Sequence, residues 1–171
     1  MTDPVPNLGD EATAILFDAI DFAVREAETT ETGFVPFVLS VAGDGEKIAT
    51  RYVDDEENFT VEGSVRLARE SLRGTDPSTR CVALAWDGFL TLGEDRTEAV
   101  FAEAYELDRP EGVMFAQRYV RGSDGLDLIG NPLLLHQRPE PLVPRAEPAD
   151  ARAEAIARIQ ALADRRKQNP R

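Results

Sequence analysis

The sequence predicts an α+β fold in which an antiparallel sheet of about five strands carries packed helices. Residues 80–121 are typical of three consecutive strands joined by loops of hairpin length, and residues 34–53 are typical of one further hairpin. Amphipathic helices stand before, between and after these groups, so the predicted element order is α-β-β-α-β-β-β-α. We expect a single domain over residues 10–137, a proline-rich linker over 138–148 and an amphipathic helix over 149–167.

The N-terminal part of the chain supplies a helix and the first hairpin. From Asp10 to about Glu28, apolar residues recur at a spacing that covers one broad face of a helix, which predicts contact with more than one element. Strands are predicted at 34–41 and 48–53, with a glycine-bearing turn between them. This turn is not expected to bind phosphate, because a strand and not a helix follows it.

A second helix is expected to begin after Asn58 or Thr60, either of which can act as its N-cap, and to end near Arg73. The four acids at 54–57 are most simply a solvated loop. Three arginines lie on the side opposite to the apolar stripe of this helix: Arg66, Arg69 and Arg73. Because glutamates stand at salt-bridging spacing to Arg66, we expect an exposed, internally paired surface and not an anion site.

Three segments in the middle of the chain are rich in β-branched, aromatic and small apolar residues: 80–92, 98–107 and 113–121. The loops between them carry the glycine, aspartate and proline residues that turns select. We expect the first loop to place Leu92 opposite Glu98. The second is expected to place Leu107 opposite Val113. With this register, residues of equal parity share one face of the sheet.

One face of this three-strand unit is predicted to be the core. It holds Leu84, Trp86, Gly88, Leu90, Val100, Ala102, Ala104, Met114, Ala116 and Val120. Trp86 is expected beside Ala104 and Ala116, and a large residue among small ones leaves room for a docked helix. A short apolar segment at 128–136, interrupted by glycine, asparagine and proline, is a candidate edge strand.

The opposite face sets polar residues side by side within an aromatic frame. The predicted row is Asp87, Glu103 and Gln117, and the residues around it are Phe89, Phe101, Tyr105, Phe115 and Tyr119. Two carboxylates directly opposite each other repel, so the pair needs a cation, a shared proton or open water. A slip of one residue in either hairpin would separate the row.

This row is the one candidate site, and it has two alternative interpretations. The simpler one is a solvated surface. In the other, Asp87 and Glu103 are candidate catalytic acids that share a proton or bind a metal. The candidate ligand-binding residues are then Gln117, Tyr119, Tyr105, Phe101 and Phe89.

Composition narrows the possible partners and location. The 32 acidic and 19 basic residues give a net charge of -13, which argues against nucleic acid and against an anionic membrane as partner. No stretch approaches the ~20 apolar residues of a membrane span, and the N-terminus has no basic and apolar leader. We therefore expect a cytoplasmic protein.

The residue types that carry chemistry are sparse. Cys81 is the only cysteine, which excludes an internal disulfide and a thiolate metal cluster. His136 is the only histidine, and no serine stands in a nucleophile elbow, so a hydrolytic triad is not expected. The acids at 54–57 lack the spaced ligands and glycine of a calcium loop. No cofactor and no resident metal are predicted.

The C-terminal helix predicts an interaction. Ala155, Ile156, Ile159 and Leu162 form an apolar stripe behind a linker with four prolines. Such a stripe folds back on its own sheet, covers a second copy of the chain or meets another protein. We expect a homodimer in which this helix or an edge strand contributes to the interface.

Two resemblances accompany these inferences. The element order resembles the roadblock and profilin-like folds, which implies a dimerising interaction or regulatory module. In addition, residues 87–89 (DGF), 96–99 (RTEA), Glu103 and 115–119 (FAQRY) resemble a pattern of small, uncharacterised bacterial proteins. That family implies no activity, but its pattern includes Asp87, Glu103, Gln117 and Tyr119.

The function that the sequence favours is a small soluble binding or regulatory module. The alternative is an enzyme in which the Asp87 and Glu103 pair acts as acid and base, or as metal ligands, in an aromatic-lined pocket. A purely structural subunit of an assembly is the third class. Replacement of Glu103 by glutamine distinguishes the first two, because only an enzyme would lose an activity.

Overall fold

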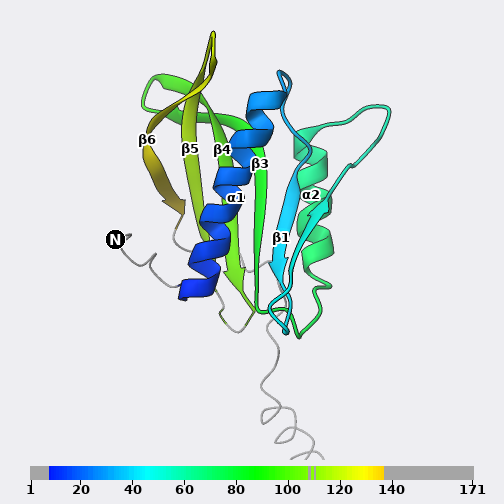
Figure 1. The fold of residues 1–171 in the computed structure, drawn as a ribbon. Helices are drawn as coiled ribbons and strands as arrows, with labels where there is room; N and C mark the ends of the chain where they lie inside the picture. Colours follow the sequence, from blue (N-terminus) through cyan, green and yellow to red (C-terminus); the bar gives the residue numbers. More distant parts are fainter. Residues whose placement is uncertain (1–7, 108, 110, 137–171) are drawn as a thin grey trace, which may run out of the picture.

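The computed structural model describes residues 8–107, 109 and 111–136. These residues form one six-stranded sheet in the order β2-β1-β3-β4-β5-β6, and every neighbouring pair of strands is antiparallel. One helix packs on each side of the sheet (Figure 1). The α+β class with an antiparallel sheet and packed helices is therefore confirmed, whereas the expected number of about five strands is too low.

Among the described residues the element order is α-β-β-α-β-β-β-β. The bounds are α1 Asp10–Thr29, β1 Phe37–Val41, β2 Lys47–Arg51, α2 Val61–Leu72, β3 Cys81–Leu92, β4 Asp95–Glu106, β5 Val113–Gly122 and β6 Gly125–His136. The candidate edge segment at 128–136 is thus part of a full strand, β6. The predicted linker over 138–148 and helix over 149–167 lie outside the described residues.

Helix α1 packs across the central strands because its sequence combines alanines with branched residues on one face. Its buried residues are Ala12, Ile15, Leu16, Ala19, Ile20, Ala23 and Ala27. Beneath it the sheet presents small side chains, among them Ala83, Ala85 and Ala102, all fully buried. Small residues on both surfaces let the helix backbone approach the sheet closely, so this layer forms the larger core.

Helix α2 begins at a side-chain cap. The Thr60 hydroxyl accepts a hydrogen bond from the Gly63 N–H at 3.1 Å and donates one to Asp54 Oδ2 at 2.8 Å. The Ser64 hydroxyl donates to Asp54 Oδ1 at 3.0 Å. Thr60 is thus the N-cap, one of the two expected candidates. Asp54 belongs to the predicted solvated loop but also holds this cap, and the hydrogen bonds from Thr60 lower the pKa of its carboxyl to about 2.

Both hairpins of the β3–β4–β5 unit close with a register that differs from the expected one. Leu92 lies opposite Asp95 and not Glu98, because Gly93 takes a φ of +63° and allows a two-residue turn. Val113 lies opposite Ala104 and not Leu107. Each difference is an odd number of residues, which moves side chains of β4 to the other face. Because both shifts are odd, they cancel for β5, and residues of equal parity in β3 and β5 still share one face.

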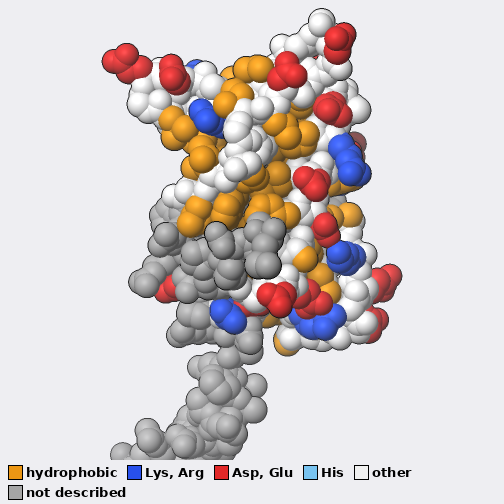
Figure 2. Space-filling view, turned by 60° about the vertical axis from the view of Figure 1, so that its left-hand side comes forward, with side chains coloured by type: hydrophobic (Ala, Val, Ile, Leu, Met, Phe, Trp, Pro, Cys, Tyr) orange, Lys and Arg blue, Asp and Glu red, His pale blue; other side chains and the backbone are white. Residues whose placement is uncertain are grey.

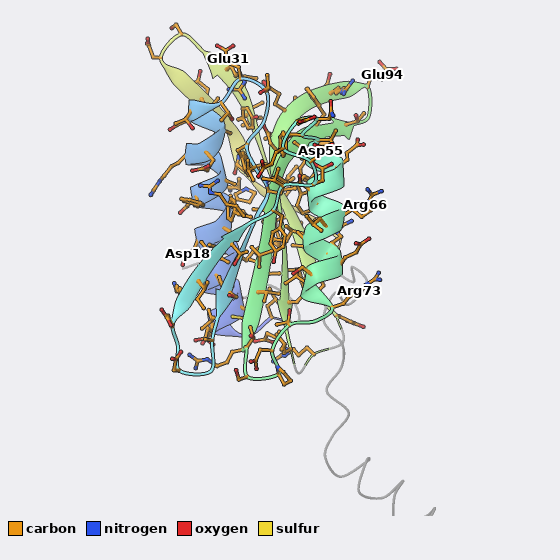
Figure 3. All side chains as sticks on the ribbon, turned by 90° about the vertical axis from the view of Figure 1, so that its right-hand side faces the viewer. Asp18, Glu31, Asp55, Arg66, Arg73 and Glu94 are labelled. Atoms are coloured by element: carbon orange, nitrogen blue, oxygen red, sulfur yellow. The ribbon has the colours of Figure 1, made fainter. Side chains whose placement is uncertain are left out.

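The predicted core face is therefore divided between the two sides of the sheet. Leu84 and Trp86 point toward α2, whereas Val100, Ala102 and Ala104 point toward α1. Helices lie on opposite sides in the edge view of Figure 3, so both faces bury apolar residues. The expected grouping of these residues on one face is wrong, because the odd change of register at Gly93 moves the apolar residues of β4 to the side opposite Leu84 and Trp86.

Candidate functional site

The expected pair of Asp87 and Glu103 does not exist in the structure. Asp87 lies opposite Val100 on the α1 face, and Glu103 lies opposite Leu84 on the α2 face. The physical reason is the two-residue turn at Gly93, which exchanges the faces of β4 relative to β3. A proton shared between these two carboxylates, or a metal held by both, is excluded by this geometry.

Glu103 is held by a cation and a phenol. Its carboxylate is 1% exposed and forms an ion pair with Arg69 of α2. The Tyr105 hydroxyl donates a hydrogen bond to Glu103 Oε2 at 2.6 Å. The guanidinium of Arg69 also lies over the ring of Trp86, 5.5 Å from its centroid. Glu103 is thus a buried charge with its partners in place, and Arg69 is not part of an internally paired surface of α2 as expected.

Asp87 stands in a different environment. Its Oδ1 accepts hydrogen bonds from the Tyr119 hydroxyl at 2.8 Å and from the Gly88 N–H at 3.0 Å. Among the described residues, its Oδ2 has no hydrogen-bond partner. Burial raises the pKa of the Asp87 carboxyl, and the hydrogen bonds from Tyr119 and Gly88 and the charge of Arg121 oppose this rise only in part.

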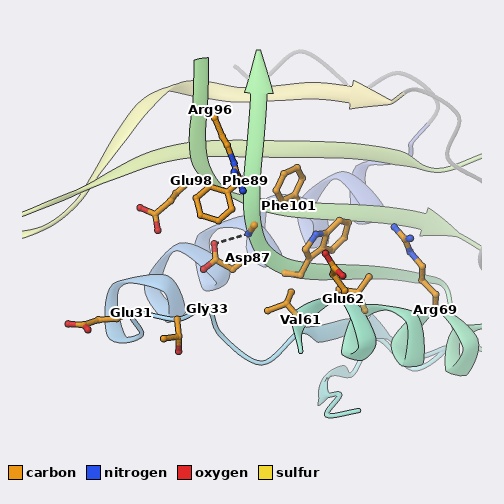
Figure 4. A pocket seen from close by; sticks show the side chains of 14 residues that line it. Glu31, Gly33, Val61, Glu62, Arg69, Asp87, Phe89, Arg96, Glu98 and Phe101 are labelled. Carbon is orange, nitrogen blue, oxygen red and sulfur yellow. Dashed lines mark hydrogen bonds between the residues drawn. The ribbon is translucent and has the colours of Figure 1, made fainter. Parts of the chain in front are cut away.

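Asp87 lines a pocket of about 730 Å³ beside strand β3 (Figure 4). The loop after α1 forms one wall with Glu31, Thr32 and Gly33, and one side of α2 forms another with Val61, Glu62, Val65 and Arg69. The floor is the β3–β4 hairpin, with Trp86, Asp87, Gly88, Phe89, Arg96, Glu98 and Phe101. The pocket therefore collects residues from both faces of the sheet around one edge of β3.

The aromatic residues of the pocket are arranged in two groups. Trp86 and Phe101 stack with ring centroids 5.5 Å apart and an interplanar angle of 9°. Phe89 is 58% exposed, and the Arg96 guanidinium lies 4.2 Å from the centroid of its ring. Phe101 and Phe89 were both candidate ligand-binding residues, and both line this pocket with Asp87.

The other candidate ligand-binding residues have structural partners. Tyr119 is fully buried and orients Asp87. Tyr105 is buried against α2 and orients Glu103. Gln117 donates from its side-chain amide to the backbone oxygens of Ile129 and Gly130 in β6, at 3.4 and 3.3 Å. Of these three, Tyr119 donates a hydrogen bond to a residue of the pocket, Asp87.

Several lining residues were missed by sequence reasoning. Gly33 has a φ of +92°, and a Cβ at this position would lie 3.6 Å from Asp87 Oδ2, so the loop passes directly beside the carboxylate. Val61 and Arg69 come from α2, the element that precedes β3 in the chain. The positive φ of Gly33 is suggested by a glycine after a helix, but no local signal links these segments to Asp87.

Among residues 8–107, 109 and 111–136, no group of three or more histidine, cysteine, aspartate or glutamate side chains is placed to hold a metal ion. The lining of the pocket mixes its acids with aromatic and aliphatic side chains and two arginines, which suits organic groups better than a bare metal. Cys81 is buried, and burial raises the pKa of its thiol to about 11, which keeps it protonated.

Comparison with known proteins adds no assignment: no family model, curated protein or solved structure matches this chain. Neither helix of the described part of the chain has the length and apolar character needed to cross a membrane. The function must therefore be argued from the geometry of the site.

Proposed function

We propose that this protein is a small binding or regulatory module, and that its ligand combines an apolar body with a positively charged group. The observation that carries the proposal is the carboxylate of Asp87. It is 9% exposed and lines the pocket, one oxygen is fixed by Tyr119 and Gly88, and the other has no partner among the described residues. A preoriented carboxylate oxygen of this kind favours a charged hydrogen-bond donor.

The charges around Asp87 support a cationic ligand. Glu31 and Glu62 line the same pocket and form no ion pair within the described residues. The lining holds two arginines, of which Arg69 pairs with Glu103 and Arg96 lies on the Phe89 ring. They are outnumbered by the acids of the lining, which are Glu31, Glu62, Asp87 and Glu98. The pocket thus has an excess of negative charge, which raises the local concentration of cations.

The apolar part of the ligand has a surface to contact. Val61, Val65, Phe101 and the Trp86 ring line the α2 side of the pocket. Aromatic and aliphatic side chains with a few placed polar groups are the usual composition of a ligand pocket, and 730 Å³ lies within the ordinary size range. The ligand is therefore amphipathic, with its cation toward Asp87.

The enzyme alternative required Asp87 and Glu103 to act as a pair, and it is not carried further because they occupy opposite faces. A homodimer and a cytoplasmic location stay predictions, and the stripe that favours the homodimer lies outside the described residues. Sedimentation of the full chain and of a chain ending near Pro144 tests the role of that stripe.

The proposal is tested with benzamidinium, a planar aromatic cation, and with benzoate as its anionic counterpart. In NMR titrations, benzamidinium is expected to shift the amide signals of Gly33, Gly88 and Phe89, and benzoate is not. Asp87→Asn keeps the acceptor for Tyr119 but removes the charge, so we expect affinity to fall about tenfold. Asp124→Asn, in the exposed β5–β6 turn, removes the same charge elsewhere and should leave affinity unchanged.

The pH dependence of this binding has a definite sign. Burial raises the pKa of Asp87, so the carboxyl is neutral at low pH and cannot pair with the cation. Affinity for benzamidinium should rise as pH increases through that pKa and level off above it, and Asp87→Asn should abolish the rise. Equal binding of benzoate, or wild-type affinity in Asp87→Asn, would show that Asp87 does not anchor a cation.

A further inference from the structure

Strand β3 is paired on both sides along only part of its length. β4 runs beside it from Cys81 to Leu92, but β1 pairs with it only from Cys81 to Ala85. The segment from Trp86 to Leu92 therefore has a neighbouring strand on one side alone. The pocket lies along the open side of this segment, since Trp86, Asp87, Gly88 and Phe89 all line it.

The pairing pattern identifies which backbone groups face the open side. Leu92 and Asp95 flank the two-residue turn, and the residues that flank such a turn form a hydrogen-bonded pair. Even-numbered residues of β3 therefore bond to β4, in agreement with the bond from Leu107 N–H to the Arg80 oxygen. The outward groups are the N–H and C=O of Asp87, Phe89 and Thr91.

Nothing in the described part of the chain satisfies these outward groups. No turn, loop or cap hydrogen bond joins the backbone of Asp87, Phe89 or Thr91 to another described residue. An open row of backbone donors and acceptors is a template for one more strand.

The composition of this edge differs from that of the two outer edges. β2 is only five residues long, is fully exposed and has Lys47 and Arg51 at its ends. β6 carries Asp127 and Pro132, and its pairing with β5 contains register shifts. Short length, charge, proline and irregular pairing are devices that prevent edge-to-edge association. Residues 88–92 (GFLTL) have no charge and no proline, and Phe89 and Leu92 are exposed.

We propose that the ligand of the pocket is an extended peptide segment of a partner protein, which adds as a strand to the open edge of β3 and carries a basic side chain to Asp87. This inference rests on the proposed function and names its ligand class. Main-chain hydrogen bonds to Asp87, Phe89 and Thr91 fix the register of the peptide, and the walls of the pocket select its side chains.

The two faces of the added strand meet different surfaces. Asp87 and Phe89 point to the α1 face, so one peptide side chain lies beside the free Asp87 Oδ2 and requires a positive charge. Its neighbour in the peptide points to the other face, where Val61, Trp86 and Phe101 line the pocket. The recognised pattern is therefore a basic residue directly next to an apolar or aromatic one.

A second copy of this chain fits the edge less well. The edge lies within a pocket whose walls are the Gly33 loop and the first turn of α2, and these walls leave less room for a second sheet than for one extended strand. In addition, the net charge of -13 makes two copies repel, whereas it attracts a basic peptide.

The probe for the test is a display library of random nonapeptides, from which enriched sequences are synthesised with blocked ends. We expect micromolar binders that contain Arg or Lys next to an apolar residue, with affinity reduced at least about tenfold by Asp87→Asn. Thr91→Pro removes one outward N–H and leaves the bonds to β4 in place, so it should reduce affinity at least about tenfold. Thr91→Val keeps that N–H and should bind as the wild type does.

A second readout does not depend on the folding of any variant. N-methylation of alternate peptide bonds in one binder should abolish binding to the wild-type protein for one set of positions and spare it for the other, because only one set faces β3.

Peptides that tolerate methylation in both sets and bind equally to Thr91→Pro would overturn the strand-addition model. The proposed function would survive that outcome if benzamidinium still bound through Asp87, and it would fall only if benzamidinium also failed. If no peptide is enriched and Thr91→Pro instead dissociates a dimer in sedimentation, the occupant is a second copy and the inference is wrong.

Discussion

At the scale of single residues, the two buried carboxylates are stabilised in different ways. Glu103 has the guanidinium of Arg69 and the phenol of Tyr105 as partners. One oxygen of Asp87 accepts hydrogen bonds from a phenol and a backbone N–H, and its other oxygen has no hydrogen-bond partner among the described residues. A buried charge with partners is stable only while those partners remain. Glu103 is therefore part of the framework, and Asp87 is the residue with an unused acceptor.

Replacement of Arg69 should destabilise the protein, because it leaves the buried charge of Glu103 without a cation. Arg69→Met leaves a carboxylate that is 1% exposed without its cation, but the Arg69 side chain is itself 41% exposed, so we expect a loss of about 2 kcal/mol in the free energy of unfolding and not the ~3–5 kcal/mol of a fully buried pair. Urea denaturation measures this loss. Arg66→Met, on the outward side of the same helix in Figure 3, is the control and should change stability by less than about 0.5 kcal/mol.

A double-mutant cycle separates the ion pair from simple packing. Glu103→Gln should destabilise the wild-type protein but recover part of the loss when added to Arg69→Met, because it removes the unpaired charge. Two repelling carboxylates would give the opposite result, a more stable Glu103→Gln protein. That outcome would contradict the ion pair described here.

At the scale of elements, α2 depends on what precedes it. Its N-cap Thr60 satisfies the Gly63 N–H, and Asp54 receives hydrogen bonds from both Thr60 and Ser64. The same first turn supplies Val61 and Glu62 to the pocket. The cap thus positions one wall of the candidate site in addition to starting the helix.

Removal of this N-cap should destabilise α2. Thr60→Ala is expected to lower the free energy of unfolding by about 1 kcal/mol, the usual cost of losing a threonine N-cap. The matched control is Asn58→Ala, which alters an exposed residue whose side chain forms a hydrogen bond only to Asp55 among the described residues and should have little effect. Equal stability of the two variants in urea denaturation would show that the helix does not depend on Thr60.

At the scale of the whole molecule, two cores share the same strands. The core under α1 and the core under α2 pack on opposite faces of β1, β3 and β4, so neither can lose its order without exposing the strands of the other. Figure 2 shows a further concentration of hydrophobic side chains on the side that presents β6, bordered by acidic and basic residues. The shared sheet predicts unfolding in one cooperative transition.

The single tryptophan makes this prediction measurable. Trp86 reports from the α2 side, whereas far-UV circular dichroism reports on the whole fold. Leu16→Ala, in the α1 core, should cost about 2–5 kcal/mol and shift both urea curves by the same amount. Leu67→Ala, at an exposed position of α2, is the control. A Trp86 fluorescence curve that stays in place while the dichroism curve moves would mean that the two cores unfold separately.

Local sequence patterns determined the fold class, both helices of the described region and the approximate place of five of the six strands, with β6 indicated only as a candidate edge segment. The spacing of apolar residues identified α1, and the choice between Asn58 and Thr60 already included the cap of α2. Asp87, Phe89 and Phe101 were expected to lie close together, and all three line one pocket, although the register behind that expectation was wrong. These features depend on residues a few positions apart, which is the range that periodicity and capping rules cover.

Only the tertiary structure decided the register and, with it, the site. Whether the hairpin closes at Gly93 with two residues or with five depends on which side chains the two helices bury, and that choice sends Glu103 to the face opposite Asp87. The pocket also needs Gly33 and Val61, which come from separate parts of the chain. Side-chain alternation has a period of two, so an odd change at one turn exchanges every residue of a strand between faces, and no local pattern in the strand itself records which face is correct.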